Sequence, residues 1–588
     1  MKKEITNFLS DIILKNYNVE LEELVLQNPP KKELGDYAFA CFQLSKTLKK
    51  SPNLIAEELS LIISKEISGN EIIDTVNVSG PYLNIKINKL SIIDSFKKYK
   101  FGVFNENVYK GKTIVVDYIG ANIGKPLHIG HMCTPNQGQA MINIYKKLSC
   151  YVISDSHMCD WGIILGKLIT AFKLYGDKNK LEENAVEHLF ELYVKISNEA
   201  EVNKDLEETF RSEFKKLSNG DPDYIKLWQN FTKGSIASVN KQLDRLNVKP
   251  DFDIGESYYE GLNFPKIQNY PDLKYSMKDI VSELIEKGIA VKNEDNSVGV
   301  IFSDESKIPS CILQKRDGTH GYLASDLASI KYRVENWSPD NIIYFVDVRQ
   351  SLHFKQVFEI ADRANWISKD KLFHAYNGFI SLKDGAMSTR KGKIIKLDKL
   401  LDESELRAEK IILEKRSDIK GEELKNLSEI IGIGAIKYGY LKKSRETDVV
   451  FDWDEFMTFE GNSGPYIQYA YVRAIRLLEK SGISSEINFS DDYKDVKDHF
   501  KQQHLNLIKL LINYNSILFE TAQKNMPHIL AGYAYELTKS FNSFYNNVEV
   551  LKEKNEKIRN FSLILTKTFS QTIKDSFSLL GIEMPDKM

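Results

Sequence analysis

Cysteine is scarce in this chain, and long apolar runs are missing. Of 588 residues only 5 are cysteines, and they form no CxxC pair (Cys41, Cys133, Cys150, Cys159 and Cys311). An odd, unpatterned set argues against a disulfide framework and against a structural metal site, and it favours a reducing compartment. No apolar run approaches the roughly 20 residues needed to span a bilayer. We therefore expect a cytoplasmic protein without a membrane segment.

An excess of charge of one sign is also missing. The 80 Lys and Arg residues nearly balance 82 Asp and Glu residues, so the formal charge is −2 and any basic surface must be local. The opening residues, MKKEITNFLSDIILKNY, contain acidic side chains and no small-residue cleavage site, which argues against a signal peptide. With 42% hydrophobic and 28% charged residues, the chain is typical of a soluble globular protein of several domains.

One stretch, Thr113 to His131, carries the strongest chemical signal. It reads TIVVDYIGANIGKPLHIGH. Its first part, Thr113 to Ile119, has the apolar, β-branched character of a buried parallel strand. Glycines then end the run, and Pro126 is expected at the first position of a helix. A strand, a tight turn and a helix N-terminus often bind phosphate, because backbone N–H groups and the helix dipole face outward.

Two histidines near the end of this stretch are the first candidate site residues. His128 and His131 lie three residues apart, so their side chains are expected to point the same way. Gly130 between them lets a flat ligand lie close to the backbone, and Lys125 adds a cation. The pattern favours a nucleotide site. Two ordinary helix histidines, or part of a metal site, are the alternatives, but no third ligand occurs at metal-site spacing.

The stretch resembles the HIGH signature of class I aminoacyl-tRNA synthetases. Its longer form, AN-x-x-KPLHIGHM, resembles the arginyl-tRNA synthetase family in particular. The resemblance continues at His157 to Gly162, where the family carries a DWG that lines the site, although Trp161 is equally well explained as a core aromatic. The resemblance implies contacts to ATP from Lys125, His128, Gly130 and His131. It also implies that Asn122 and His131 bind the α-amino and carboxylate groups of the amino acid.

A predicted helix from Tyr322 to Arg333 supplies a candidate amino-acid pocket. Tyr322 and Asp326 stand four apart and share a face. A guanidinium needs a carboxylate to accept its planar donors, but such a pair alone is usually a surface pair. The context, DG-x-x-x-Y-x-x-x-D, a strand, then Gln350 followed by H-F-x-Q, resembles the family's arginine pocket. The resemblance places Tyr322, Asp326 and Gln350 around arginine, adds Glu256 as a second anion, and assigns His353 to ATP binding.

A second catalytic element is expected at Asp384 to Lys393, which reads DGAMSTRKGK. A basic, glycine-flanked loop is suited to steadying a triphosphate, and a solvated basic loop is the alternative. The stretch resembles the KMSKS loop of class I synthetases in its arginyl form, MSTRKG. The first lysine of that pattern is Ala386 here, so Arg390, Lys391 and the compensating cation Lys125 are the expected catalytic cations. Met387 and Ser388 are expected to contact ATP.

The order of these motifs predicts a multidomain α/β protein. We expect an N-terminal α+β domain at 1–105, then a Rossmann-like, parallel-sheet catalytic domain at 106–395 with a helical insertion at about 175–250. A helical stem-contact region at 396–450 and an all-helical anticodon-binding bundle at 451–588 complete the prediction. By resemblance the N-terminal domain contacts the D-loop of tRNA; a packing domain explains it equally well. A solvated helical hairpin without a catalytic role is the default interpretation of the insertion.

The sequence is thus identified as a member of the arginyl-tRNA synthetase family. Membership implies ATP-dependent activation of L-arginine to arginyl-adenylate and transfer to the 3′ end of tRNA-Arg, with release of AMP and pyrophosphate. Mg²⁺ is expected only as the counter-ion of ATP, and a monomer is expected. Three alternatives remain. They are a synthetase for another amino acid, a nucleic-acid-binding module with an inactive catalytic core, which Ala386 favours, and a small-molecule nucleotidylyltransferase, which would not need the flanking domains.

Overall fold

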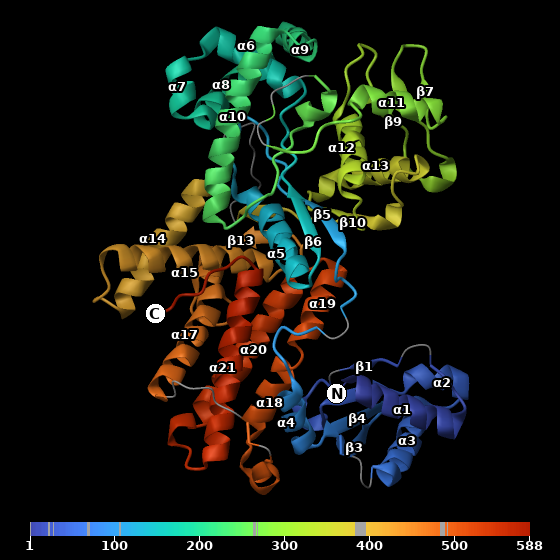
Figure 1. The fold of residues 1–588 in the computed structure, drawn as a ribbon, viewed down its shortest axis with the longest axis vertical. Helices are drawn as coiled ribbons and strands as arrows, with labels where there is room; N and C mark the ends of the chain where they lie inside the picture. Colours follow the sequence, from blue (N-terminus) through green and yellow to red (C-terminus); the bar gives the residue numbers. More distant parts are fainter. Residues whose placement is uncertain are drawn as a thin grey trace. The chain divides into compact units, whose positions relative to one another are not determined.

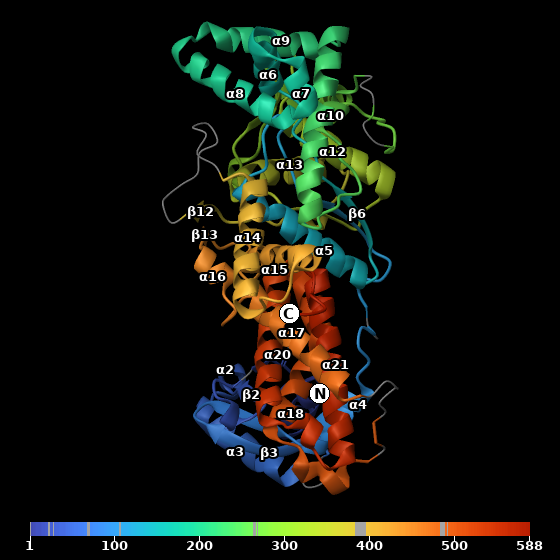
Figure 2. The same cartoon turned by 90° about the vertical axis from the view of Figure 1, so that its left-hand side faces the viewer.

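The chain divides into two compact units in the computed structural model (Figures 1 and 2). Residues 2–21, 24–27, 29–67, 71–104, 107–262, 266, 269–382, 395–482, 489–490 and 492–588 are described. One unit comprises Met1–Val103, Arg473–Asn515 and Leu537–Thr572, and the other comprises Phe104–Val472, Ser516–Glu536 and Ile573–Met588. Among the described residues no helix has both the length and the apolar character needed to cross a membrane.

A parallel four-stranded sheet organises the second unit. Its strand order is β11-β10-β5-β6, formed by β5 (Thr113–Asp117), β6 (Tyr151–Asp155), β10 (Asn341–Tyr344) and β11 (Leu372–His374). Asp117 at the end of β5 pairs with Tyr344 on one side and Asp155 on the other, so these strands end together. The order of the sheet reverses between β5 and β10, and ligands of open α/β sheets bind outside the carboxyl ends at such a point. The predicted strand at Thr113 is confirmed.

The helix expected at Pro126 begins eight residues later than predicted. Pro126 lies in an irregular segment, a 3₁₀ turn covers Ile129–Met132, and α5 runs over Thr134–Lys147 with Pro135 in its first turn. The segment before the turn cannot be helical because its backbone groups bond elsewhere. The N–H of Ile123 bonds to the carbonyl of Cys159, and the carbonyl of Leu127 accepts from Leu397. The helix prediction at Pro126 is therefore wrong, and Pro135 is the proline in the first turn of a helix.

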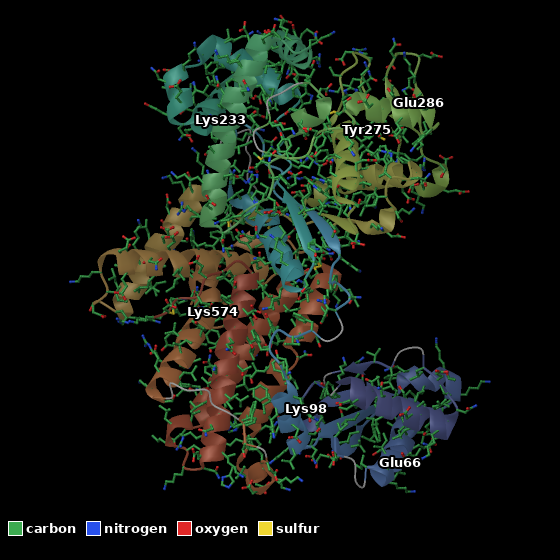
Figure 3. The ribbon with its side chains drawn as sticks, in the orientation of Figure 1. Glu66, Lys98, Lys233, Tyr275, Glu286 and Lys574 are labelled. Atoms are coloured by element: carbon green, nitrogen blue, oxygen red, sulfur yellow. The ribbon has the colours of Figure 1, made fainter. Side chains whose placement is uncertain are left out.

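Five helices form the insertion after β6. They are α6 (Ile163–Tyr175), α7 (Lys178–Glu183), α8 (Ala185–Val202), α9 (Asp205–Ser218) and α10 (Pro222–Arg245). Helix α6 packs against α8 and α9, and α10 packs against α8 (Figure 2). Lys233 on α10 is exposed (Figure 3), whereas Ser235 two residues later is buried. The prediction of helices at about 175–250 is confirmed.

The remaining elements of this unit surround the sheet. An antiparallel sheet contains β7 (Ala290–Lys292), β8 (Val298–Val300) and β9 (Cys311–Gln314), and β12 (Ile380–Leu382) pairs with β13 (Val449–Phe451). The helices are α11 (Met277–Glu286), α12 (Tyr322–Trp337), α13 (Ser351–Arg363), α14 (Leu397–Lys415), α15 (Gly421–Leu441) and α16 (Trp453–Met457). The helix predicted to begin at Tyr322 is confirmed.

The first unit contains a small antiparallel sheet of order β1-β2-β4-β3. Its elements are α1 (Lys2–Tyr17), β1 (Leu26–Gln27), β2 (Tyr37–Ala40), α2 (Phe42–Leu48), α3 (Pro52–Glu66), β3 (Ile73–Ser79), β4 (Tyr82–Ile87) and α4 (Lys89–Lys98). The helices near the end of the chain contribute to both units; they are α17 (Gly464–Lys480), α18 (Gln502–Leu511), α19 (Tyr514–Lys524), α20 (Pro527–Asn547) and α21 (Glu556–Leu579). Phe561 of α21 is fully buried and its ring contacts Phe96 of α4. An aromatic contact therefore joins α4, in the N-terminal part of the chain, to α21, in the C-terminal part.

Candidate active site

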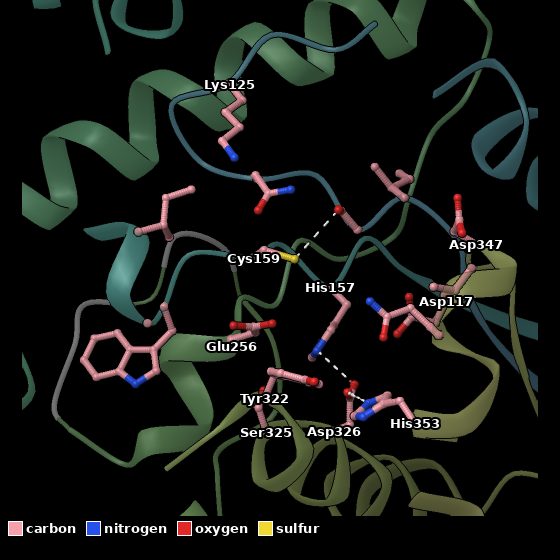
Figure 4. A pocket seen from close by; sticks show the side chains of 18 of the residues that line it. Asp117, Lys125, His157, Cys159, Glu256, Tyr322, Ser325, Asp326, Asp347 and His353 are labelled. Carbon is pink, nitrogen blue, oxygen red and sulfur yellow. Dashed lines mark hydrogen bonds and ion pairs between the residues drawn. The ribbon is translucent and has the colours of Figure 1, made fainter. Parts of the chain in front are cut away.

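A cavity of about 760 Å³ opens beyond the carboxyl ends of β5, β6 and β10 (Figure 4). It brings together every predicted site residue that the structure describes. These residues are Asn122, Lys125, His128, Gly130, His131, Glu256, Tyr322, Asp326, Gln350 and His353. The candidate loop residues Met387, Ser388, Arg390 and Lys391 lie outside the described residues. Lys125 and Asp326 lie on opposite sides of the cavity, with His157 and Glu256 between them (Figure 4).

The histidine pair caps its own 3₁₀ turn. Nδ1 of His128 accepts the N–H of Gly130 at 3.0 Å, and Nδ1 of His131 accepts the N–H of His128 at 3.0 Å. Because both Nδ1 atoms are acceptors, Nε2 carries the proton in each neutral ring. Burial, with His128 nearby, lowers the pKa of His131 to about 3, and burial with the charges of Arg349 and Lys125 lowers that of His128. Two neutral N–H donors therefore line this side of the cavity.

Gly130 has a different steric role from the predicted one. A Cβ atom at this position would lie 2.7 Å from Cε1 and 2.9 Å from Nδ1 of His128. The space over the glycine is therefore filled by the imidazole of His128 itself. Its missing side chain allows His128 to fold back and bond the backbone, which fixes the ring that lines the cavity.

Asp326 receives a histidine on each oxygen. Nε2 of His353 lies 2.5 Å from Oδ2, and Nε2 of His157 lies 3.4 Å from Oδ1. Burial opposes ionisation of the carboxyl group, but these two partners outweigh it and hold the pKa of Asp326 well below its usual range. Burial also opposes protonation of His157, yet the bond to Asp326 and the charge of Asp117 raise its pKa to about 9. This side of the cavity therefore presents an ionised Asp326 carboxylate paired with a protonated His157.

A second acid, Glu256, stands between the two sides. It begins the 3₁₀ turn Glu256–Glu260, and its N–H bonds to the carbonyl of Met158 in the segment after β6. Burial raises the pKa of Glu256 to about 8, with further contributions from Asp326 and Asp160 that oppose the favourable charge of His157. Glu256 is therefore mostly protonated near neutrality, and an incoming cation would favour its ionised form.

A buried ion network holds α12 against the strand ends. Arg333, with no exposed side-chain surface, places one guanidinium nitrogen 2.7 Å from Asp117 and 2.9 Å from Asp155. Asp155 in turn accepts the N–H groups of Ile254 and His157. Because Arg333 lies seven residues after Asp326 on one helix, the network fixes the position of Asp326 relative to the strands.

No group of three or more His, Cys, Asp or Glu side chains suited to hold a metal ion occurs among the described residues. The charged groups of the cavity suit a different chemistry. Neutral donors and cations line one side, and the carboxyl groups of Asp326 and Glu256, with His157 beside them, line the other. The arrangement can hold a small molecule with an anionic group at the histidines and a cationic group at Asp326.

Comparison with known proteins assigns the chain to a family. The family model for the catalytic domain of class I (R) tRNA synthetases matches residues 98–453. Models for the DALR anticodon-binding domain and the arginyl-tRNA synthetase N-terminal domain match residues 467–588 and 1–87. The arginine–tRNA ligase of Clostridium botulinum strain Alaska E43 is 36% identical over 589 residues, which cover 99% of each chain. The chain belongs to the arginyl-tRNA synthetase family.

Further arginyl-tRNA synthetases agree with this assignment. The Clostridium beijerinckii enzyme is 35% identical over 99% of each chain. The solved Thermus thermophilus arginyl-tRNA synthetase has a TM-score of 0.79 at 21% identity over the full length of both chains. The Plasmodium falciparum structure has a TM-score of 0.78 at 23% identity over 100% of this chain and 99% of that one. The predicted fold class and the prediction of an arginine-specific aminoacyl-tRNA synthetase are confirmed.

Sequence reasoning missed three groups at this synthetase site. His157 was singled out only within the DWG stretch, and its backbone has a φ of +42°, which L residues rarely adopt. Arg349 lines the cavity and makes a two-pronged pair with Asp347, with both contacts at 2.9 Å. Its position directly before Gln350 was the available signal. The available signal for Arg333 was its spacing. It lies seven residues after Asp326, so both charged side chains lie on the same face of the helix.

Proposed function

We propose that this chain joins L-arginine to tRNA-Arg in two steps within the cavity around Asp326. The carboxylate of Asp326 shares that cavity with the paired imidazoles of His128 and His131, and this single observation carries the proposal. A carboxylate with a depressed pKa suits a guanidinium, and the neutral N–H donors opposite suit a phosphate. One cavity can therefore hold arginine and ATP with their reacting ends facing each other.

In the first step the carboxylate of arginine attacks the α-phosphorus of ATP, and pyrophosphate leaves. The substrate carboxylate is already a nucleophile, so the protein needs no general base. Its contribution is positioning, together with stabilisation of charge on the phosphate oxygens. His128 and His131 donate Nε2–H groups for that purpose, because their Nδ1 atoms are occupied by backbone N–H groups.

Arginine is bound by groups on α12 and around the strand ends. Asp326 receives the guanidinium, while Tyr322 and Gln350 fix its plane, and Glu256 adds a second anion. Asn122 and His131 bind the α-amino and carboxylate groups. Tyr322 and Gln350 both line the cavity and are both exposed, so a substrate in the cavity can contact them.

ATP is bound by the signature segment and by residues outside the described part of the chain. Lys125 replaces the loop lysine that is Ala386, and Arg390 and Lys391 supply further cations. Met387 and Ser388 contact ATP. His353 is assigned to ATP by resemblance. Its bond to Asp326 also supports a second role, which is to orient the carboxylate that receives the guanidinium of arginine. Mg²⁺ enters as part of the ATP substrate.

The second step transfers arginine to the 2′-hydroxyl of the terminal ribose, and the first step requires bound tRNA. We retain the sequence-based division for these tasks. Residues 1–105 contact the D-loop, 106–395 catalyse, 396–450 contact the stem, and 451–588 bind the anticodon. The enzyme works as a monomer in the cytoplasm.

Measuring tRNA-dependent ATP–pyrophosphate exchange with each amino acid in turn tests this proposal. We expect exchange with arginine alone. Exchange with a different amino acid would contradict the substrate assignment. Silence with every amino acid would favour a nucleic-acid-binding module with an inactive core, and exchange with a small phosphorylated metabolite in the absence of tRNA would favour a nucleotidylyltransferase.

A further inference from the structure

The helical insertion contacts the nucleotide side of the cavity through α8 and α10. Phe190 of α8 and Phe214 of α9 line the cavity directly. Three contacts link the insertion to two segments. One segment carries Gly124 and Lys125, and the other carries Lys396, which pairs with His128. A solvated hairpin would have no such contacts, so the default interpretation of the insertion does not account for them.

The first contact joins Glu187 of α8 to Lys396. Both carboxylate oxygens of Glu187 lie 2.6 Å from Nζ of Lys396. Lys396 pairs in antiparallel fashion with His128. The N–H of Ile129 bonds to the carbonyl of Ile395 at 3.0 Å, and the N–H of Leu397 bonds to the carbonyl of Leu127 at 2.9 Å. Glu187 therefore fixes the strand-like segment against which His128 is held.

The second contact joins Tyr193, also on α8, to Lys125. Nζ of Lys125 lies 4.3 Å from the centre of the Tyr193 ring. A lysine side chain has many rotamers, and an aromatic face attracts its ammonium group and restricts them. Figure 4 shows Lys125 extending toward the cavity. The ring of Tyr193 thus limits where this cation lies before a triphosphate arrives.

The third contact fixes the backbone that precedes Lys125. The N–H of Gly124 donates to Oγ of Ser235 on α10 at 3.0 Å, and this bond is buried. Gly124 has a φ of +71°, and a Cβ there would lie 2.9 Å from Leu168 of α6 and 3.2 Å from Leu189 of α8. The insertion therefore packs closely on the turn itself.

From these contacts we propose that the insertion positions the ATP-binding segment. Glu187, Tyr193 and Ser235 are positioning residues that act through Lys396, Lys125 and Gly124. The inference rests on the proposed function, since it names ATP as the ligand whose site is positioned. It predicts a larger effect on ATP than on arginine, because the proposed guanidinium partner Asp326 has its own contacts to His157 and His353 in the network around α12.

The test measures KM for ATP and KM for arginine in the exchange reaction, and ATP affinity by calorimetry, which needs no turnover. We expect Glu187→Gln and Tyr193→Leu each to raise KM and Kd for ATP about three- to tenfold, with a smaller change in KM for arginine. Tyr193→Phe keeps the ring and should restore the wild-type KM. Exchanging the charges in Glu187→Lys with Lys396→Glu should restore most of the affinity lost by either change alone.

Matched controls come from the same insertion. Glu191→Gln makes the same change in charge at an exposed position of α8, one turn after Glu187. Tyr175→Leu removes a comparable contact, in which Nζ of Lys195 lies 3.4 Å from the Tyr175 ring. Neither residue takes part in the three contacts to Lys396, Lys125 and Gly124, so both controls should keep the wild-type KM for ATP.

Equal KM for ATP in the wild type, Glu187→Gln and Tyr193→Leu would overturn the inference. A parallel rise in KM for arginine, or the same effect in the controls, would overturn it as well. If the wild type shows no arginine-dependent exchange but the variants still bind ATP more weakly by calorimetry, the proposed function fails and the positioning role stands.

Discussion

Asp326 illustrates at the residue scale how the site combines charge with orientation. His353 occupies one oxygen at 2.5 Å, and His157 lies farther from the other at 3.4 Å. A guanidinium that bonds both oxygens must replace at least the weaker of these contacts. The two histidines keep the carboxylate ionised and turned into the cavity, so its orientation is set before the substrate binds.

Asp326→Asn keeps the shape of the side chain and removes its charge. We expect KM for arginine to rise at least about thirtyfold, because truncating one partner of a buried charge pair costs about 2–5 kcal/mol. KM for ATP should stay within about twofold of the wild type, since loss of binding confined to one substrate changes that KM alone. Glu335→Gln makes the same chemical change farther along α12 and is the control. Unchanged arginine affinity in Asp326→Asn would contradict the pocket assignment.

We expect Glu256 to make arginine binding depend on pH. Its pKa is raised to about 8, so below that pH most molecules carry a neutral Glu256. A bound guanidinium favours the carboxylate, so binding releases a proton, and affinity increases as the pH rises toward 8. His157, whose pKa is raised to about 9, acts in the same direction because its positive charge competes with the guanidinium.

We therefore expect KM for arginine to fall between about pH 6.5 and pH 8, by at most about tenfold per pH unit for each proton released. Glu256→Gln cannot ionise and should show a shallower dependence. Steady-state kinetics at constant ionic strength measure both profiles. A KM that rises over this range, or identical slopes for the two proteins, would contradict the assignment.

Helix α12 shows at the element scale how a buried ion network positions a site. Arg333 ties the helix to Asp117 and Asp155 at the ends of β5 and β6. Removing only the arginine would leave two buried carboxylates without the guanidinium that they share. The network therefore ties the stability of the unit to the position of the substrate-binding helix.

Arg333→Met should lower the free energy of unfolding by about 3–5 kcal/mol, as expected when one partner of a buried ion pair is removed. Urea denaturation measures the change. Arg349→Met is the comparison, because its pair with Asp347 is largely exposed and should contribute less than about 1 kcal/mol. Equal stability losses in the two variants would contradict the structural role of Arg333.

The elements that the sequence predicted are those with a strong local pattern. The apolar run at β5 and the four-residue spacing of Tyr322 and Asp326 each specify one local structure. The helix start at Pro126 was wrong because contacts from Cys159 and Leu397, distant in sequence, hold that segment in an irregular conformation. Strand β2 was missed because its four residues carry little periodicity and form a strand by pairing with β1 and β4.

The contacts between the insertion and the site could also not be predicted from local sequence patterns. Glu187 and Lys396 are 209 residues apart, and Gly124 and Ser235 are 111 apart. Helical periodicity predicts which face of α8 is apolar, but not which partner it meets. The residues within motifs were predictable, whereas the residues that position them depend on tertiary contacts.

At the scale of the whole molecule, the N-terminal residues proposed to contact tRNA belong to the first unit, whereas the cavity belongs to the second. All residues of the cavity belong to the second unit. Phe561 lies in the first unit, where its ring centre is 5.7 Å from that of Phe96 and 4.9 Å from that of Phe500. This core supports both the N-terminal domain and late helical residues.

Phe561→Ala should therefore weaken tRNA binding without changing ATP affinity. Truncating a buried phenylalanine costs about 3–5 kcal/mol of stability, and the loss falls on the first unit. Filter binding of tRNA-Arg and calorimetry with ATP measure the two effects. A loss of ATP affinity equal to the loss of tRNA affinity would contradict the separation of tasks.

A structure of the protein with a non-hydrolysable arginyl-adenylate analogue tests the central claim most directly. The account predicts that the guanidinium lies within hydrogen-bonding distance of the Asp326 carboxylate. The phosphate should lie against the Nε2 atoms of His128 and His131, and Glu256 should approach the guanidinium. An analogue bound with its guanidinium away from Asp326, or with its phosphate away from both imidazoles, would contradict it.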